Sequence, residues 1–372
     1  MLYYSWKENG MIIGVPKEIK VEEFRVGLTP VGCRELAQGS HIVLIEESAG
    51  TGSGFSDDEY RKAGAEVVSR ESVFGRSKLI VKVKEPVPPE YPLLRPGIAL
   101  FTYLHLAPNP GLTKMLTEKN VTGLAYETLE KGGRLPLLAP MSEVAGRMAP
   151  LMGAFYLQRF KGGSGILPTG VSGVHPGKLL VLGAGVVGTN AARVGTGLGM
   201  ETVVINRDPA GLQRIDELFK GRVRTIPLSV HALEEEVRDA DIVVGAVLVP
   251  GGRTPVLITR EMLRTMKKGS VIVDVSVDQG GCVETSRPTT HDDPVFEAEG
   301  VIHYCVANMP GAYPRTSTIA LTNATLPYVK LVADKGVEQA IRESAEIRSA
   351  LNTHQGKITN EALATALKTQ MI

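Results

Sequence analysis

The sequence contains little cysteine, and this scarcity excludes one class of protein. Its 372 residues include three cysteines, Cys33, Cys282 and Cys305, which lie far apart and form no C-x-x-C pair. Small secreted proteins that depend on disulfides carry even numbers of cysteines at closer spacing. The pattern therefore excludes a disulfide framework and is typical of a protein in the reducing cytoplasm.

Long apolar runs and an excess of one charge are also missing. No apolar stretch reaches the roughly 20 residues of a membrane-spanning helix, so we expect no membrane partner. The 41 basic and 40 acidic residues leave a net charge of +1, which lacks the basic excess typical of nucleic-acid-binding proteins. The composition, with 43% apolar residues, is that of a globular protein long enough for two domains.

The first ten residues differ from the rest of the chain. They contain the only tryptophan, Trp6, and lack the apolar core of a signal peptide. We expect residues 1–10 to be an N-terminal extension. Two interpretations remain open, a poorly ordered extension from an upstream start or tag, and an arm that contacts a neighbouring subunit.

One stretch organises the remaining sequence. The apolar run 179–182 predicts a buried strand. It leads into a G-x-G-x-x-G pattern formed by Gly183, Gly185 and Gly188. A helix-like run over 186–198 and a second buried strand over 202–205 complete the unit. In this context the glycines predict a dinucleotide site, because the helix N-terminus offers unpaired N–H groups to phosphates. The alternative is a glycine-rich turn in another α/β unit.

Strand-like and helix-like segments alternate on both sides of this unit. Strands are expected at 11–15, 41–45, 79–84, 97–102, 121–125, 241–247, 271–275 and 301–306. Such alternation predicts α/β architecture with doubly wound parallel sheets. The last 60 or so residues are expected to be helices without strands, which must pack on the first domain.

The expected architecture is therefore two doubly wound Rossmann-like domains with a cleft between them. Residues 11–137 and 315–372 would form a discontinuous substrate and catalytic domain. Residues 138–314 would form the dinucleotide-binding Rossmann domain. A cofactor and a small substrate commonly meet between two such domains.

Four polar residues stand out as candidates for chemistry: Arg25, Lys84, His105 and Asp278. The last three come at or just past the carboxyl ends of predicted parallel strands, where open α/β sheets bind ligands. Each has a simpler alternative. Arg25 could form a surface ion pair, and Lys84, like Lys82, could extend to solvent. His105 could be a core histidine, and Asp278 could shape a turn.

Together the four suit a nicotinamide enzyme that acts on a small amino or hydroxy acid. Arginine binds a carboxylate through two parallel hydrogen bonds. Lysine can polarise a keto oxygen, and histidine transfers protons near neutral pH. Aspartate can balance cationic charge and orient the attacking or leaving nitrogen.

Several strings resemble the L-alanine dehydrogenase family, which includes the related N-terminal part of the transhydrogenase alpha subunit. They are GVPKE (14–18), EFRV (23–26), KVKEP (82–86), YLHL (103–106), PMSEVAGR (140–147), GAVLVPG (245–251), DQGGC (278–282) and NMP (308–310). They occur in order from residue 11 to near the C-terminus. The resemblance implies NAD-dependent, reversible oxidative deamination of L-alanine to pyruvate and ammonia.

The resemblance also implies roles for individual residues. Arg25 would bind the substrate carboxylate and Lys84 the pyruvate oxygen. His105 would be the acid/base group, with Asp278 beside the nicotinamide and Asn308 near it. Cofactor contacts would come from Ser142, Gly183, Gly185, Val187, Gly188, Asn206, Arg207, Gly245 and Asp278. No metal is implied, and the family is usually a homo-hexamer.

One position departs from the family pattern. About 20 residues beyond the glycines, NAD enzymes usually place an acidic residue that binds the ribose 2′-hydroxyl, normally Asp in this family. Here the position is Asn206, followed by Arg207. Asparagine does not repel a 2′-phosphate, and Arg207 could pair with one. We therefore expect NAD as the cofactor, with NADP as the alternative.

Two other functions stay open. The chain could be the nucleotide-binding module of a proton-translocating transhydrogenase, without an amino-acid substrate of its own. It could also be a non-catalytic nucleotide-binding protein. The joint presence of Arg25, Lys84, His105 and Asp278 favours the dehydrogenase over both. Motifs leave open whether serine, glycine or 2-oxobutyrate is also used.

Overall fold

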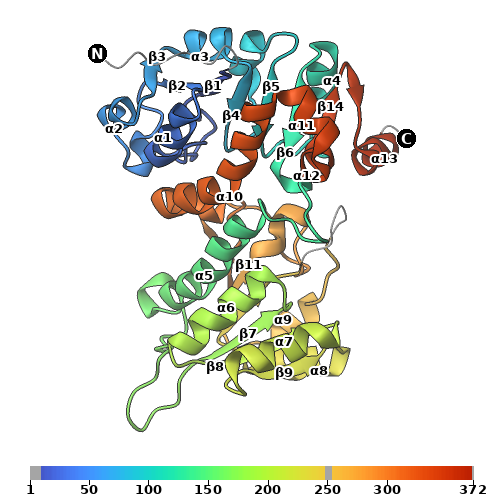
Figure 1. The fold of residues 1–372 in the computed structure, drawn as a ribbon. Helices are drawn as coiled ribbons and strands as arrows, with labels where there is room; N and C mark the ends of the chain where they lie inside the picture. The colour runs from blue at the N-terminus through green and yellow to red at the C-terminus, as the bar shows by residue number, and fades with distance from the viewer. Residues whose placement is uncertain (1–9, 248–253, 371–372) are drawn as a thin grey trace. The chain divides into compact units, whose positions relative to one another are not determined.

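The computed structural model describes residues 10–247 and 254–370, and the chain divides into two compact units (Figure 1). Unit 1 comprises Met1–Met141 and Tyr313–Ile372, and unit 2 comprises Ser142–Ala312. Residues 1–9 of the expected extension lie outside the described residues, as does the 248–251 part of the GAVLVPG string.

Unit 1 contains an eight-stranded sheet in the order β15-β14-β6-β5-β4-β1-β2-β3. Its parallel strands are β1 (Ile12–Val15), β2 (Ile42–Glu46), β3 (Glu66–Val68), β4 (Leu79–Val81), β5 (Ala99–Thr102) and β6 (Thr122–Ala125). Two antiparallel strands, β14 (Leu351–His354) and β15 (Lys357–Ile358), complete one edge. The helices are α1 (Pro30–Gln38), α2 (Asp57–Lys62), α3 (Arg70–Arg76), α4 (Pro110–Glu118), α10 (Pro314–Lys335), α11 (Val337–Glu343), α12 (Ala345–Ala350) and α13 (Glu361–Gln370).

Strands β14 and β15 show that the expectation of a strand-free C-terminal segment was wrong. Strand β14 pairs with β6, with Leu351 opposite Leu124 and Thr353 opposite Gly123. Its sequence LNTH has no alternation of apolar and polar residues, so local pattern gives no strand signal. Pairing with a distant strand, rather than local propensity, therefore creates this strand.

Unit 2 contains a seven-stranded sheet in the order β12-β13-β11-β10-β7-β8-β9. The strands are β7 (Lys178–Leu182), β8 (Glu201–Asn206), β9 (Arg224–Pro227), β10 (Ile242–Gly245), β11 (Val271–Asp274), β12 (Val295–Ala298) and β13 (Val301–Tyr304), and the pairing is parallel except at β12. The helices are α5 (Ala139–Tyr156), which begins in the last residues of unit 1, α6 (Val186–Gly197), α7 (Pro209–Phe219), α8 (Val230–Asp239) and α9 (Arg260–Thr265). Two parallel-dominated sheets confirm the predicted α/β class.

Local sequence signals fix several helix starts. The Thr29 side chain accepts a hydrogen bond from the Gly32 N–H, and Pro30 is the first residue of α1. Ser56 and Glu59 form a capping box at the start of α2. One strand end differs from expectation, because β4 stops at Val81 and Lys84 lies beyond it.

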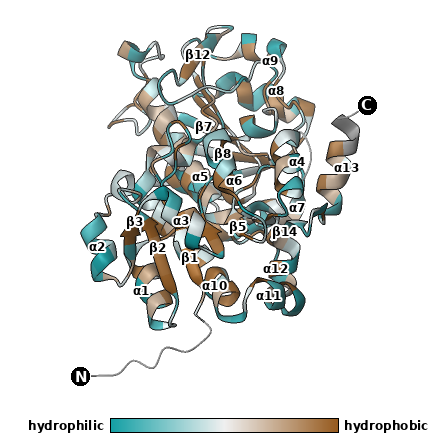
Figure 2. Cartoon of the chain, turned by 90° about the horizontal axis from the view of Figure 1, so that it is seen from above, coloured by the Kyte–Doolittle hydropathy of each residue, from teal (hydrophilic) through white to brown (hydrophobic). Residues whose placement is uncertain are grey.

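The sheet of unit 2 is buried on both faces. Leu179 and Val181 of β7 point into one hydrophobic core, and Leu180 and Leu182 point into the other. This double burial explains the continuous apolar run of the sequence. In unit 1, Figure 2 shows β1, β2 and β3 as hydrophobic and α2 as a mostly hydrophilic helix. Each fully buried Val or Leu contributes about 1.5–3 kcal/mol to the stability of the unit that contains it.

Both units share a doubly wound strand order. The order β3-β2-β1-β4-β5-β6 in unit 1 matches β9-β8-β7-β10-β11-β13 in unit 2. In each sheet the first three strands follow one another to one side of β1 or β7, and the later strands are added on its other side, from β4 or β10 onward. Ligands of open α/β sheets bind at the carboxyl ends of the strands at such switch points. Within the described part of the chain, no helix is both long and apolar enough to cross a membrane.

Candidate functional site

Three predicted residues of unit 1 follow the strands at its switch point. Arg25 follows β1, Lys84 follows β4 and His105 follows β5. Strand β4 pairs in parallel with both β1 and β5, so the three carboxyl ends meet at one edge of the sheet. The structure thus brings these three residues to the same edge.

Arg25 is held by a buried carboxylate. Its Nε and Nη2 donate to the Oε1 and Oε2 of Glu23 at 2.6 and 2.5 Å, and its Nη1 donates to the Met141 sulfur at 3.0 Å. The Arg25 side chain is 2% exposed, which rules out a surface ion pair. Burial opposes both charges, but the pairing outweighs it, raising the pKa of Arg25 and lowering that of Glu23. The guanidinium therefore stays charged and fixed in orientation.

Lys84 is positioned through its backbone. Glu18 Oε1 accepts hydrogen bonds from the N–H groups of Val83 at 2.6 Å and Lys84 at 3.3 Å. The Thr102 hydroxyl donates to the Lys84 carbonyl at 2.9 Å. Burial, followed by the positive charge of Arg25, lowers the pKa of Lys84. A half-buried lysine of this kind is suited to hydrogen-bond a substrate oxygen.

Lys82 does not extend to solvent, contrary to the expected alternative. Its Nζ lies 2.7 Å from Glu90 Oε1 and 3.1 Å from Glu18 Oε2, and all three side chains are 1–2% exposed. Burial raises the pKa of Glu18 against the opposing effect of Lys82. Burial would lower the pKa of Lys82, but the two carboxylates raise it. This buried cluster anchors the segment that carries Lys84.

His105 is exposed and has an unusual backbone. Its φ is +45°, in the left-handed region that non-glycine residues rarely occupy. The N–H groups of Leu104 and His105 donate to Glu127 Oε1 at 3.1 and 2.7 Å. The imidazole Nδ1 lies 3.1 Å from Glu85 Oε2, and the side chain is 44% exposed. His105 is therefore not a core histidine, and strained backbones of this kind cluster at functional sites.

In unit 2 the glycine pattern forms the predicted turn between β7 and α6. Gly183 has φ +110°, and a Cβ there would lie 2.5 Å from the Ala246 carbonyl oxygen. A Cβ on Gly188 would lie 1.9 Å from the Gly183 oxygen. At Gly185, by contrast, no atom of the described residues other than its two neighbours in the chain lies within 4 Å of the Cβ position. The open surface above Gly185 at the start of α6 fits a dinucleotide pyrophosphate.

The other predicted cofactor residues surround this turn. A Cβ on Gly146 of α5 would lie 2.3 Å from the Val187 oxygen, so α5 packs closely on the start of α6. Ser142 is half-buried one turn earlier on α5. Gly245 ends β10, where a Cβ would lie 2.6 Å from the Cys282 sulfur. Gly245 thus permits close packing behind the turn.

Asn206 at the end of β8 braces the glycine turn. Its Oδ1 accepts from the Ala184 N–H at 3.1 Å, and its Nδ2 donates to the Asp208 oxygen at 2.8 Å. Arg207 is exposed beside it. Arg214 of α7 donates to the Ala184 oxygen, which places a second cation at this turn. No motif had pointed to Arg214.

Asp278 and Asn308 belong to unit 2, whereas Arg25, Lys84 and His105 belong to unit 1. Asp278 is exposed on the 3-10 turn Val275–Gln279 that follows β11. The buried carboxylate of Asp274 holds this turn through the N–H groups of Ser276 at 3.0 Å and Cys282 at 2.9 Å. Asn308 is half-buried, and its carbonyl oxygen lies 3.0 Å from the His291 ring nitrogen.

Several supporting carboxylates were not predicted individually. Glu18, Glu23 and Glu85 lie inside strings that carried the family resemblance, so their proximity to Arg25 and Lys84 was the available signal. Glu127 lies 22 residues beyond His105 and gave no signal.

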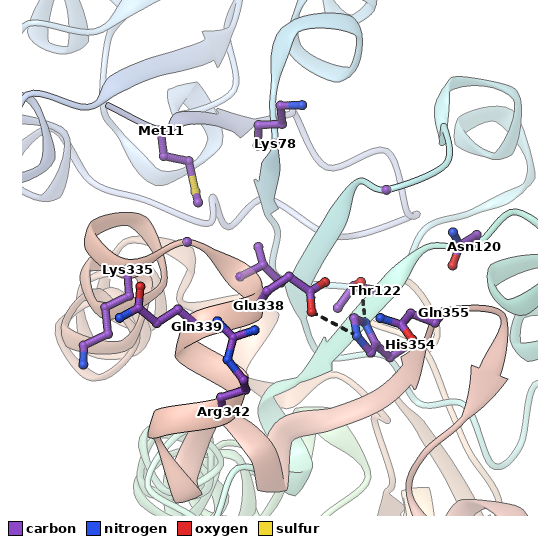
Figure 3. Close-up of a pocket in the computed structure, with 13 residues that line it drawn as sticks. Met11, Lys78, Asn120, Thr122, Lys335, Glu338, Gln339, Arg342, His354 and Gln355 are labelled. Atoms are coloured by element: carbon purple, nitrogen blue, oxygen red, sulfur yellow. Dashed lines mark hydrogen bonds and ion pairs between the residues drawn. The ribbon is translucent and has the colours of Figure 1, made fainter. Parts of the chain in front are cut away.

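A cavity of about 480 Å³ in unit 1 lies away from these residues (Figure 3). Lys78 and Asn120, which line it, precede β4 and β6, so it lies at the amino ends of the strands. His354 in its wall contacts Thr122 at 3.0 Å and Glu338 at 3.4 Å. The predicted site residues do not line it, so it is distinct from the edge that carries Arg25.

Comparison with known proteins covers nearly the whole chain. The family model "Alanine dehydrogenase/PNT, N-terminal domain" matches residues 14–145, and "Alanine dehydrogenase/PNT, C-terminal domain" matches residues 149–361. The chain is 51% identical over 355 residues to the alanine dehydrogenase of Bacillus subtilis (strain 168), covering 95% of this chain and 94% of that one.

Solved structures give the same result. An L-alanine dehydrogenase matches with a TM-score of 0.94 and 46% identity, covering 96% of this chain and 99% of that chain. A transhydrogenase from Sinorhizobium meliloti matches with a TM-score of 0.83 and 26% identity, covering 94% and 100%. On sequence, domain models and fold together, the chain belongs to the alanine dehydrogenase/PNT family.

Proposed function

We propose that the chain is an L-alanine dehydrogenase, which converts L-alanine and water to pyruvate and ammonium with hydride transfer to a nicotinamide cofactor, and catalyses the reverse reaction. The observation that carries this proposal is the set of Arg25, Lys84 and His105 at one edge of the unit 1 sheet. Identity of 51% to a curated alanine dehydrogenase supports it. The alternative, a transhydrogenase module, is less supported because its structural match is 26% identical.

The residues of unit 1 divide the chemistry of the substrate. The Arg25 guanidinium binds the substrate carboxylate, and Glu23 fixes its plane. Lys84 donates a hydrogen bond to the carbonyl oxygen of pyruvate. In the oxidative direction, loss of hydride leaves an iminium carbon on the substrate. His105 accepts a proton from water as the water oxygen bonds to this carbon and the C=N π bond opens onto the nitrogen. His105 then returns the proton to the nitrogen, which leaves as ammonia when the C–N bond breaks and the carbonyl forms. General acid–base catalysis of this kind contributes about 10²–10⁴ in rate.

A nicotinamide dinucleotide, when bound, supplies the acceptor or donor of the hydride. The turn at Gly183, Gly185 and Gly188 would hold its pyrophosphate, with Ser142 and Val187 beside it. Asp278 and Asn308 would lie near the nicotinamide, and Gly245 would support the turn. We propose NAD as the cofactor and NADP as the alternative, since Asn206 is uncharged and Arg207 is exposed.

Domain roles, assembly and location complete the proposal. Residues 11–137 and 315–372 would bind the substrate, and residues 138–314 would bind the cofactor. We propose a homo-hexamer on the family resemblance alone, and a cytoplasmic location on the three scattered cysteines.

The test follows the absorbance of the reduced cofactor at alkaline pH with L-alanine, using NAD and NADP in parallel. We expect alanine-dependent reduction by the wild type and its loss in His105→Ala. Binding of nucleotide without reduction of either cofactor would overturn the proposal in favour of a binding module.

A further inference from the structure

We propose that Glu85 is a positioning residue for His105. Its carboxylate accepts a hydrogen bond from Nδ1–H of His105, and Nε2 is then the ring atom that exchanges the proton. The inference rests on the acid/base role of His105 given above. It names which ring nitrogen reacts and which side chain makes that choice.

The contact itself is direct. Glu85 Oε2 lies 3.1 Å from His105 Nδ1, within hydrogen-bonding distance. The Glu85 side chain is 12% exposed, whereas that of His105 is 44% exposed. The carboxylate is thus held inside the protein, while the imidazole keeps accessible surface for a substrate.

The charge state of Glu85 decides the tautomer. Burial would raise the pKa of Glu85, but His105 and Lys20 outweigh it and lower the pKa to about 2. Glu85 is therefore ionised at any pH at which an amino-acid dehydrogenase is active. An ionised carboxylate only accepts hydrogen bonds, so the ring nitrogen that faces it must carry the proton. In neutral imidazole the other nitrogen, Nε2, is then the base.

Several other groups face this pair. Lys20, from the loop after β1, forms an ion pair with Oε1 of Glu85, whereas the His105 nitrogen contacts Oε2. Glu127 accepts hydrogen bonds from the backbone N–H groups of Leu104 and His105. The Tyr103 ring lies 5.9 Å from the imidazole, centroid to centroid. Glu85 consequently links the loops that follow β1, β4 and β5.

The backbone of His105 supports the same interpretation. Its left-handed φ of +45° costs of order 1–3 kcal/mol for a non-glycine residue and persists only where neighbours hold it. Glu127 fixes the backbone and Glu85 fixes the ring. Two carboxylates from different segments thus determine where Nε2 lies.

In the proton transfer, the water O–H bond breaks and an N–H bond forms at Nε2. The hydroxide oxygen bonds to the iminium carbon that hydride transfer has left on the substrate, and the C=N π bond opens onto the nitrogen. The imidazolium that results carries its positive charge next to the Glu85 carboxylate. Loss of that carboxylate removes the stabilisation of the imidazolium.

The experiment measures kcat/KM for L-alanine against pH in the wild type, Glu85→Gln and Lys20→Met. We expect the activity to rise with pH, because the proposed reaction needs a proton acceptor. We expect Glu85→Gln to move the midpoint of this rise to lower pH by about one unit, since an opposite charge within 4–6 Å shifts titration by about 1–3 units. Lys20→Met removes the other partner of Glu85, so its midpoint stays in place or moves to higher pH. Glu85→Asp keeps the charge and should retain a midpoint near that of the wild type.

A second readout does not depend on turnover. Carbethoxylation modifies neutral imidazole, and mass spectrometry of the peptide that contains His105 gives its rate at each pH. The rate profile should shift in Glu85→Gln as the activity profile does. Unchanged profiles in Glu85→Gln, with His105→Ala inactive, would overturn the role of Glu85 and leave the proposed function intact. An active His105→Ala would overturn the acid/base role of His105, and a wild type that reduces neither cofactor would overturn the proposed function, while carbethoxylation would still report the Glu85 contact in both cases.

Discussion

Glu23 binds Arg25 along one edge of its guanidinium, through Nε at 2.6 Å and Nη2 at 2.5 Å, although the two residues are separated by a single position. The pair is buried, so if one partner is removed, solvent cannot hydrate the charge of the other. The orientation and charge of Arg25, the residue proposed to bind the substrate carboxylate, therefore depend on Glu23.

We expect Glu23→Ala to lower the free energy of unfolding by about 3–5 kcal/mol, because it leaves a buried cation unpaired. Urea denaturation against the exposed control Glu47→Ala measures the effect. A loss no larger than that of the control would show that water reaches Arg25.

Lys82→Met should place two carboxylates in a buried space without a cation. Burial raises the pKa of Glu18 against the effect of Lys82, so without Lys82 this pKa rises further and the folded variant binds a proton that the unfolded chain releases. When the pKa of a carboxyl is raised in the folded state, the protein loses stability as the pH rises through the pKa of the unfolded state and then that of the folded state.

The variant should therefore be destabilised by about 3–5 kcal/mol at pH 8 and by less at pH 5. Denaturant unfolding at the two pH values, compared with the wild type, measures this difference. Equal destabilisation at both pH values would contradict the account of the cluster.

Two glycines of the turn should respond differently to the same substitution. A Cβ on Gly185 meets open space, so Gly185→Ala should fold normally and weaken NAD binding by about 10-fold or more through contact with the ligand. A Cβ on Gly188 collides with the Gly183 oxygen, so Gly188→Ala should lose about 1–3 kcal/mol of stability.

Thermal unfolding and fluorescence titration with NAD separate the two effects. The opposite pattern, with Gly185→Ala unstable or Gly188→Ala neutral, would show that the turn has another conformation.

Arg207→Ser should affect one cofactor alone. Arg207 is exposed at the turn after β8, and its charge would act on a 2′-phosphate but not on a hydroxyl. If NADP is used, its KM should rise by about 10-fold, since hydrogen bonds to charged groups contribute about 1.5–3 kcal/mol. Parallel kinetics with NAD provide the control, and an equal change for both cofactors would contradict a selective role.

Much of the architecture could be predicted because its signals are local. The glycine unit at 183–188 and the caps at Thr29 and Ser56 depend on neighbouring residues, and the structure confirms them. Strand β14 was missed because its sequence is polar and its partner β6 is far away in the chain.

The carboxylates that hold the candidate site residues could also not be predicted from neighbouring sequence. The burial of Lys82 depends on Glu18, which lies 64 residues earlier. The left-handed backbone of His105 depends on Glu127, whose carboxylate arrives from the segment after β6. Candidate reactive residues could thus be named from sequence, while the carboxylates that orient them required the fold.

The pairing of β14 with β6 has a consequence for synthesis of the chain on the ribosome. Until residues 351–354 have been made, β6 is an edge strand of the unit 1 sheet with an unpaired backbone. The intervening residues include all of unit 2, which can complete its own sheet during that interval. The nascent protein thus carries an open sheet edge through more than half of its translation, and this edge is where chaperones would protect it from aggregation.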